Sequence, residues 1–314
     1  MHAWQRSAFR PPLRRWWALA LALATAALVI PASFLASAQS ESIRVVASPY
    51  GQVQVISIPF AGRTRSFRLF VPTGLRDRPH TLLVALHWLN GTAARFETEK
   101  GLDRGARANN AVIVYPQGVG RSWDAGSCCG YAVRHHLDDV RFVLRIVADV
   151  EHRVPVDPRR VAVTGFSNGA LMSYRLICER PDVFRVALGV AGDVVSPRCV
   201  PDRPVSLLHV HGARDTVIPI DGERTSPIDP YGFPPAADSV NRIADADRCN
   251  GATTTSNTLT VSWVANGCAD GAQVRFITSR TLTHRYPTGA AAATTYGVDM
   301  STLTWSFLRT AWPA

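Results

Sequence analysis

Hydrophobic and polar residues alternate along two segments, residues 53–58 and 65–71, on either side of the turn Phe60–Ala61–Gly62–Arg63. A period of two is typical of half-buried strands, so the pair predicts an antiparallel hairpin at the edge of a sheet. Further along the chain the pattern changes to compact apolar runs, which suit strands buried on both faces. These runs are residues 81–86, 111–115, 161–164, 186–191, 205–210 and 274–278.

Stretches with helical spacing lie between the apolar runs. The clearest is Leu137–His152, where Asp138 or Asp139 can cap the start. Its apolar residues recur on one face: Val140, Val143, Leu144 and Val147. A last helix is expected to start near Asp299 and to bury Leu303 and Phe307.

Strands and helices therefore alternate, which predicts an α/β fold with a mostly parallel central sheet and helices on both faces. A chain of 314 residues can form one domain around such a sheet. Residues 225–235 include four prolines and a glycine, so we expect an ordered surface loop there.

The first 38 residues have the pattern of a secretory signal peptide. Arginines without any acidic residue precede an apolar run over residues 18–30, and residues 36–38 (Ala-Ser-Ala) form a small-residue cleavage site. An uncleaved membrane anchor is the alternative, because the apolar stretch approaches the length that spans a bilayer. Pro31 and the serine-rich end favour cleavage. We expect a single exported domain over residues 39–314, without stable membrane insertion after cleavage.

Positive charge does not indicate a nucleic-acid partner. The formal net charge is +10, and without the four arginines of the predicted signal peptide it becomes +6. The remaining charge is spread along the chain with no block of like charges, so nucleic-acid binding is not predicted.

Six cysteines and an exported chain favour disulfides. Short loops select two pairs and leave a third, vicinal pair: Cys178 with Cys199, Cys249 with Cys268, and Cys128 with Cys129. Zinc is the competing interpretation, but no paired CxxC or HxxxH spacing accompanies these residues, so we expect no metal.

The strongest chemical signal is the run VAVTGFSNGA over residues 161–170. It places a GxSxG motif between a buried strand and a helix that starts near Asn168, which is the context of a nucleophile elbow. Gly165 and Gly169 suit a strained turn where side chains two residues on either side of Ser167 would collide. The alternative is an ordinary strand-to-helix corner with a capping serine. We predict that Ser167 is a nucleophile, with the amide of Asn168 facing the reacting oxygen.

A serine nucleophile needs a histidine to accept its proton and an acid to orient that histidine. Asp215 lies in the loop after the run that ends at residue 210, and in this arrangement the acid precedes the base. Asp193 and Asp221 are rivals: Asp193 fits a turn cap better, and Asp221 lies further from a strand end. His284 is the only histidine after the acid, so it is the predicted base. The same order leaves three earlier histidines with structural roles: His87, His209 and His211.

A second oxyanion donor is expected from the loop after Leu86, and the Leu89 amide is the favoured candidate. Trp123 has two interpretations that we weigh equally: it lines an acyl or sugar site, or it is a core residue packed on Cys128 and Cys129.

These motifs together resemble the secreted polyhydroxybutyrate depolymerase and feruloyl esterase family of carbohydrate-esterase-like α/β-hydrolases. The resemblance extends from about residue 65 to the C-terminus and rests on short runs at residues 114–118, 121–130, 154–161, 165–176, 211–219 and 266–268. It implies an α/β-hydrolase fold, export, and hydrolysis of ester bonds in polymers or their fragments through an acyl-enzyme, without a cofactor. The implied substrates are hydroxyalkanoate polyesters or polysaccharide-linked feruloyl and acetyl esters.

Two motifs depart from the family pattern. Trp88 stands where a glycine is expected in the oxyanion loop, so it is a candidate to line the acyl pocket, and His284 lies in RTLTHRYP rather than in a glycine-rich run. They define the second hypothesis, a secreted binding protein that kept the fold and lost activity. Peptidase action is a third hypothesis.

Overall fold

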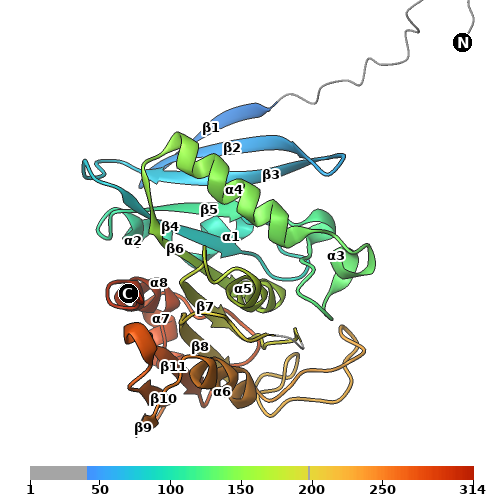
Figure 1. The fold of residues 1–314 in the computed structure, drawn as a ribbon, viewed down its shortest axis with the longest axis vertical. Helices are drawn as coiled ribbons and strands as arrows, with labels where there is room; N and C mark the ends of the chain where they lie inside the picture. The colour runs from blue at the N-terminus through green and yellow to red at the C-terminus, as the bar shows by residue number, and fades with distance from the viewer. Residues whose placement is uncertain (1–40, 197–198) are drawn as a thin grey trace, which may run out of the picture. The chain divides into compact units, whose positions relative to one another are not determined.

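Eleven strands form one mixed sheet in the computed structural model, which describes residues 41–196 and 199–314 (Figure 1). Their order across the sheet is β1-β2-β3-β5-β4-β6-β7-β8-β11-β10-β9. The six central strands from β5 to β11 run parallel, and the strands at both ends pair antiparallel. The parallel central strands and the antiparallel hairpin of β2 and β3 are thus confirmed. The predicted edge position of the hairpin is wrong, because β1 pairs with β2 on its outer side.

The strands are β1 Ser42–Ser48, β2 Gly51–Phe60, β3 Arg63–Pro72, β4 His80–Leu86, β5 Ala111–Pro116, β6 Val156–Phe166, β7 Val186–Val190, β8 Ser206–Gly212, β9 Gly251–Ser256, β10 Thr260–Asn266 and β11 Val274–Ser279. The helices are α1 Ala93–Lys100, α2 Asp103–Ala106, α3 Gly130–Arg134, α4 Asp139–Arg153, α5 Asn168–Glu179, α6 Ala236–Ala246, α7 Ala290–Tyr296 and α8 Met300–Leu308. Two short 3-10 helices are η1 Val119–Arg121 and η2 Ala269–Gly271.

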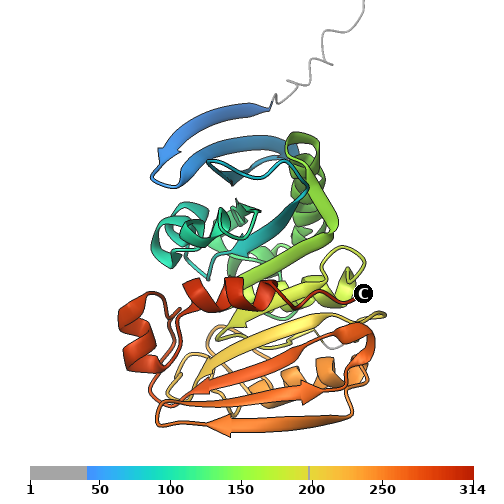
Figure 2. The same ribbon diagram turned by 90° about the vertical axis from the view of Figure 1, so that its left-hand side faces the viewer.

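Helices cover both faces of the sheet and enclose two hydrophobic cores (Figure 2). Helices α4, α5 and α6 pack on one face, while α1, α2 and α8 pack on the other. Strand β4 serves both cores because alternate side chains point to opposite faces: Leu82 and Val84 lie in the first core, Leu83 and Ala85 in the second. This two-sided burial explains why the central strands are continuous apolar runs.

The predicted helices lie where expected. Of the two candidate caps of α4, Asp138 is the one used, because its side chain accepts the Arg141 amide. Asp299 caps α8, and Phe307 is buried as predicted. Leu303 is only half-buried, because it lies at the edge of the helical stripe that faces the sheet.

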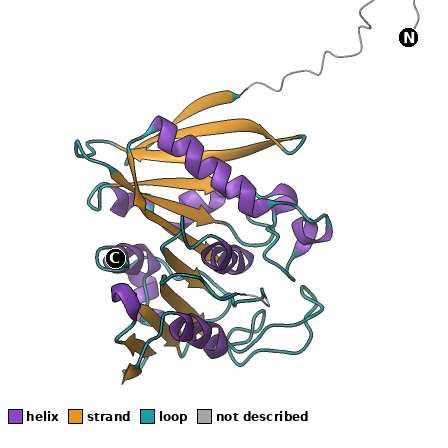
Figure 3. Ribbon diagram, viewed as in Figure 1, coloured by secondary structure: helices purple, strands orange, loops and turns teal. Residues whose placement is uncertain are grey.

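Three strands were not predicted from the sequence: β1, β9 and β10. All six residues of β9 are exposed, so its side chains carry no hydrophobic pattern. Residues 225–232 are a loop without helix or strand, as expected, and a bridge between Glu223 and Phe233 closes it (Figure 3).

All three predicted disulfides are present: Cys128–Cys129, Cys178–Cys199 and Cys249–Cys268. The predicted signal peptide, residues 1–38, lies outside the described residues. Within the described ranges, no helix combines the length and apolar character needed to cross a bilayer.

Candidate active site

Ser167 occupies a tight corner between β6 and α5. Its backbone has φ 55° and ψ −124°, a combination that L-residues rarely adopt. A Cβ on Gly165 would lie 2.2 Å from the backbone of Gly169, and one on Gly169 would lie 2.1 Å from the Leu86 carbonyl oxygen. Both glycines are therefore required sterically, and the strained corner holds the serine hydroxyl at the carboxyl end of the sheet.

Three side chains from three loops meet at this corner. The His284 Nε2 atom lies 2.9 Å from the Ser167 hydroxyl oxygen, and its Nδ1 atom lies 2.7 Å from Asp215 Oδ2. The loops follow β6, β8 and β11, whose carboxyl ends lie at one edge of the sheet. The structure thus brings together the predicted nucleophile, acid and base in the geometry of a serine hydrolase triad.

Asp215 is held as a carboxylate. Its second oxygen, Oδ1, accepts hydrogen bonds from the amides of Val217 at 2.9 Å and Ile218 at 3.0 Å. Burial by itself would raise the pKa of Asp215, but the hydrogen bond and charge of His284, together with the two amides, outweigh burial and lower it. The acid is therefore ionised and available to stabilise an imidazolium.

The loops that carry the acid and the base are bound directly to each other. The Ala213 amide donates to the Ser279 carbonyl at 2.8 Å, and the Arg214 amide donates to the Leu282 carbonyl at 3.0 Å. A Cβ on Gly212 would lie 2.1 Å from that Leu282 oxygen, so only glycine permits the approach. These contacts fix the spacing between Asp215 and His284.

The two rival acids lie elsewhere. Asp221 is exposed and has no contact with His284 among the described residues. Asp193 is fully buried, and neither carboxylate oxygen has a hydrogen-bond partner in the described part of the chain. The expected turn cap at Asp193 is therefore wrong, because its side chain points into the interior instead of toward a backbone amide. Burial, followed by the charge of Asp215, raises its pKa well above the usual value.

Asn168 has two features that matter for an oxyanion. Its amide is the first N–H of α5 and has no acceptor within that helix. Its side chain is paired with the backbone of Trp123: Oδ1 accepts the Trp123 amide at 2.7 Å, and Nδ2 donates to the Trp123 carbonyl at 3.0 Å. Sequence reasoning identified the amide but not the side-chain contact.

The loop after β4 passes beside the elbow, because a Cβ on Gly169 would lie 2.7 Å from the His87 carbonyl oxygen. Leu89, the candidate for the second oxyanion donor, lies two residues further along this loop. The amides of Asn90 and Gly91 donate to the carbonyls of Arg121 and Trp88. The amide of Leu89 has no such acceptor among the described residues. The Leu89 amide therefore stays the predicted second oxyanion donor, together with the Asn168 amide.

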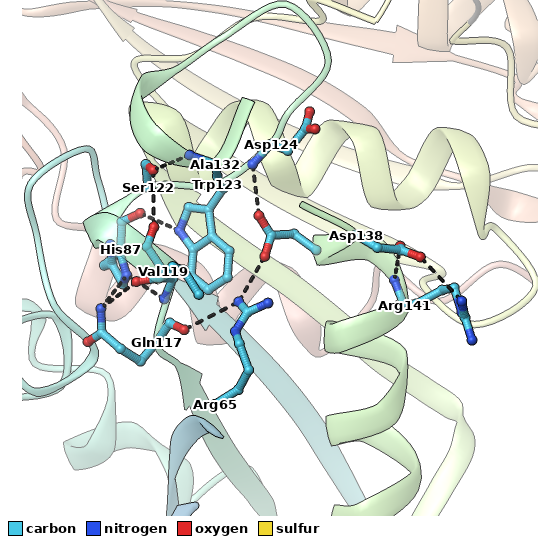
Figure 4. A network of polar contacts seen from close by, with 12 residues as sticks. Arg65, His87, Gln117, Val119, Ser122, Trp123, Asp124, Ala132, Asp138 and Arg141 are labelled. Carbon is cyan, nitrogen blue, oxygen red and sulfur yellow. Dashed lines mark hydrogen bonds and ion pairs between the residues drawn. The ribbon is translucent and has the colours of Figure 1, made fainter. Parts of the chain in front are cut away.

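His87 holds this loop through a buried polar network (Figure 4). Its Nε2 atom accepts the Gly118 amide at 3.0 Å, so Nδ1 carries the proton and donates to the Trp88 carbonyl at 2.8 Å. Burial lowers the pKa of His87 to about 4, so the ring is neutral. The structural role predicted for His87 is thus confirmed.

Trp123 is a core residue rather than a substrate-lining one. Its side chain has 0% exposure, and its Nε1 atom donates to the His87 carbonyl at 2.8 Å. The substrate-lining interpretation is therefore wrong, because the indole is buried beneath the site. Its contacts with His87 and Asn168 connect the two segments that supply the candidate oxyanion donors.

Trp88, by contrast, is only half-buried and belongs to an aromatic group beside the base. Its ring lies 5.9 Å from that of Phe166, which lies 5.1 Å from the His284 imidazole. The side chain of Lys100 covers the ring, with Nζ 4.6 Å from its centroid. Trp88 stays a candidate for the acyl side of the site.

A groove of about 510 Å³ lies among segments that neighbour the elbow. Its lining includes Gly126, Val194, Val195, Tyr231, Pro234 and Arg242. Two of its walls are close in sequence to residues that contact the elbow. Gly126 lies three residues after Trp123, whose amide donates to Asn168. Val194 lies two residues after Gly192, where a Cβ would lie 3.1 Å from the Ser167 carbonyl oxygen. The third wall is the proline-rich loop, which Ser127 holds by donating to Asp229 at 2.6 Å.

Parts of the chain are similar in sequence to known esterases. Residues 142–227 match the Phospholipase/Carboxylesterase family. The chain is 36% identical over 174 residues to the putative esterase NocK of Nocardia uniformis subsp. tsuyamanensis, covering 54% of this chain and 50% of the relative. It is 28% identical over 192 residues to feruloyl esterase B of Piromyces equi, covering 57% and 35%. The chain thus spans about half the length, or less, of these curated relatives.

Solved structures show the same fold over a larger share of the chain. Acetyl xylan esterase from Aspergillus awamori matches with a TM-score of 0.53 at 16% identity, covering 82% of this chain and 99% of its own. The S-formylglutathione hydrolase of Agrobacterium tumefaciens matches with a TM-score of 0.57 at 13% identity, covering 86% and 99%. At these identities the likeness shows the fold alone. The sheet, the nucleophile elbow and these structures together show the α/β-hydrolase fold, and the sequence is similar to those of esterases.

Proposed function

We propose that the chain is a secreted serine esterase that hydrolyses carboxylic esters through an acyl-enzyme. The observation that carries the proposal is the continuous contact from Asp215 through His284 to Ser167, with separations of 2.7 and 2.9 Å. The similarity to a putative esterase and to feruloyl esterases supports the same reaction class.

In the first half-reaction Ser167 Oγ attacks the ester carbonyl carbon while its proton passes to His284 Nε2. The carbonyl oxygen becomes an oxyanion, which the amides of Asn168 and Leu89 stabilise. When the tetrahedral intermediate collapses, the bond to the alcohol oxygen breaks and His284 returns its proton to the leaving alcohol. An acyl group then remains on Ser167.

Water completes the second half-reaction. His284 accepts a proton from the water as its oxygen attacks the acyl carbon, and the second intermediate releases the carboxylic acid as the proton returns to Ser167 Oγ. Asp215, ionised and bound by two amides, stabilises the imidazolium in both halves. All of these steps use side chains and amides of this chain.

The groove beside the elbow supports a substrate with an extended group beyond its ester bond. Tyr231 is 79% exposed at the groove and offers an aromatic surface, and Arg242 supplies a positive charge. We propose an ester of a polysaccharide-linked feruloyl or acetyl group, or of a hydroxyalkanoate oligomer, with the half-buried Trp88 on the opposite side. The assembled triad does not favour the alternative of a non-catalytic binding protein.

The test compares the wild-type chain with Ser167→Ala on a panel of butyryl, feruloyl, acetyl-xylan and hydroxybutyrate esters. We expect turnover of a short p-nitrophenyl ester to fall by about 10⁶-fold in the variant, because the nucleophile is lost. Circular dichroism should show an unchanged fold. Equal turnover by both proteins would refute the assignment of Ser167, and no turnover of any ester by the wild type would refute the esterase function.

A further inference from the structure

Three buried polar side chains form a continuous hydrogen-bonded row behind the acid loop. The Tyr174 hydroxyl from α5 lies 2.6 Å from His209 Nδ1, and His209 Nε2 lies 3.0 Å from His211 Nδ1. The row ends where His211 Nε2 lies 2.8 Å from the Ile218 carbonyl oxygen. All three side chains are fully buried, so no solvent competes for these bonds.

The carbonyl at the end of the row determines the position of every proton in it. A carbonyl only accepts, so His211 Nε2 must carry a hydrogen. With His211 neutral, its Nδ1 is an acceptor, and His209 Nε2 must donate to it. His209 Nδ1 is then an acceptor as well, and the Tyr174 hydroxyl donates to it. Both histidines are thereby fixed as the Nε2–H tautomer.

The surroundings keep both rings neutral. Burial is the main cause that lowers the pKa of His209 and of His211, and each ring also faces the other. Asp193 lies near both rings, with a carboxylate oxygen within 4.8 Å of a nitrogen of each, and burial raises its own pKa well above the usual value. The ring of Phe276 from β11 also lies against His209, with 5.0 Å between ring centroids.

The row reaches the catalytic acid through one residue. Ile218 accepts from His211 with its carbonyl and donates its amide to Asp215 Oδ1 at 3.0 Å. His211 Nε2 also lies 3.7 Å from Asp215 Oδ2, the oxygen that contacts His284. Movement of the His211 ring would therefore displace the residue that orients the carboxylate.

A metal site is the competing use of these side chains. One ligand atom each from Asp193, His209 and His211 lie within 4.8 Å of one another. In the tautomers derived above, however, each imidazole has a single lone pair, and Tyr174 and His209 already occupy the two lone pairs. Metal binding would require both of these hydrogen bonds to break.

We propose that Tyr174, His209 and His211 are positioning residues that fix the acid loop and thereby aim Asp215 at His284. The proposal rests on the esterase function argued above, since its effect is exerted on that triad. It assigns the two histidines of the β8 strand a role in turnover, although neither touches substrate.

The first test reads the tautomers directly, by long-range ¹H–¹⁵N correlation NMR of the folded protein labelled with ¹⁵N-histidine. Signals are assigned from variants at 209 and 211. We expect two neutral Nε2–H tautomers that do not titrate between pH 6 and pH 9. An Nδ1–H tautomer or an imidazolium at either position would overturn the proposal, as would a stoichiometric transition metal detected by elemental analysis. This measurement does not depend on any enzymatic activity.

The second test separates positioning from stability by comparing His211→Leu, His211→Gln and Tyr174→Phe with a matched control, Tyr115→Phe. Tyr115 is also fully buried, and its replacement by phenylalanine removes a 2.5 Å hydrogen bond to Asp103, which lies outside the row. We expect kcat to fall by about 100-fold in His211→Leu with KM little changed, because misplaced catalytic groups cost about that much. Glutamine can still donate to the Ile218 carbonyl, so the kcat of His211→Gln should be at least about tenfold higher than that of His211→Leu.

We expect Tyr174→Phe to lower kcat and Tyr115→Phe to lower only the melting temperature. If His211→Leu does not fold, the kcat of Tyr174→Phe and the tautomer measurement still test the proposal. A kcat in Tyr174→Phe or His211→Leu that matches Tyr115→Phe, or equal kcat values for the two His211 variants, would overturn the proposal. An inactive wild type with the predicted tautomers would instead count against the esterase function alone.

Discussion

The His284 Nε2 atom lies 2.9 Å from the Ser167 hydroxyl oxygen, although 117 residues separate the two in sequence. Asp215 lies on the opposite side of the imidazole, 2.7 Å from Nδ1. This arrangement follows from the parallel sheet, which brings the loops after β6, β8 and β11 to one edge. The direct hydrogen bonds between the acid and base loops then set the fine spacing.

Replacement of Asp215 by asparagine should lower kcat by about 10⁴-fold, because an amide cannot stabilise the imidazolium and favours the wrong tautomer of His284. Steady-state hydrolysis of a p-nitrophenyl ester measures the effect. Asp221→Asn is the matched control, since Asp221 is an exposed acid six residues away in sequence. A large loss in the control, or a nearly active Asp215→Asn, would show that the acid is misassigned.

Arg65→Met should destabilise the fold by about 3 kcal/mol, because it leaves the Asp139 carboxylate buried without its partner. The two side chains lie 2.8 Å apart, and Asp139 also accepts the Asp124 amide at 2.9 Å. Arg141→Met removes a comparable but exposed pair, with Asp138 at 3.6 Å, and should cost less than about 1 kcal/mol. Urea unfolding compares the two, and equal losses would contradict the prediction.

Asp247→Asn should stabilise the protein more at pH 8 than at pH 5. Burial raises the pKa of Asp247 to about 7, above its ordinary value of 3.8. The folded state therefore binds a proton that the unfolded state releases, and stability falls as the pH rises between these two values. Asparagine stays neutral and still accepts the Val205 amide. Melting temperatures at both pH values test this, and a gain that does not grow with pH would contradict it.

Reduction of the denatured protein should raise its mass by about 6 Da, two hydrogens for each of three bridges. The Cys178–Cys199 bridge closes a loop with a sequence separation of 21, so replacing both cysteines by serine should cost about 3 kcal/mol. Intact-mass spectrometry and urea unfolding measure the two effects. An unchanged mass would mean that the six cysteines are thiols.

Much of the fold was predictable because its strands are buried on both faces and its helices on one. The strands at residues 81–86 and 161–164 could be predicted from their apolar pattern alone. Strand β9, Gly-Ala-Thr-Thr-Thr-Ser, could not be found this way, because all its residues are exposed and its position depends on backbone pairing with β10. Strand β1 is also mostly exposed.

The triad was predictable because the chemistry restricts the order of its members and the sequence offers one histidine after Asp215. What the sequence did not reveal depends on contacts across the fold. Trp123 could be read as a surface or a core residue until its contacts with His87 and Asn168 were known. Asp193, expected to cap a turn, proved to be buried beside two histidines for which no local pattern exists.

Labelling with a fluorophosphonate shows whether Ser167 is an activated nucleophile. Intact-mass and peptide mass spectrometry of the full chain should find one adduct, located on Ser167, that forms slowly in Asp215→Asn and is absent in Ser167→Ala. A wild-type chain that remains unlabelled, or an adduct at another serine, would contradict the account.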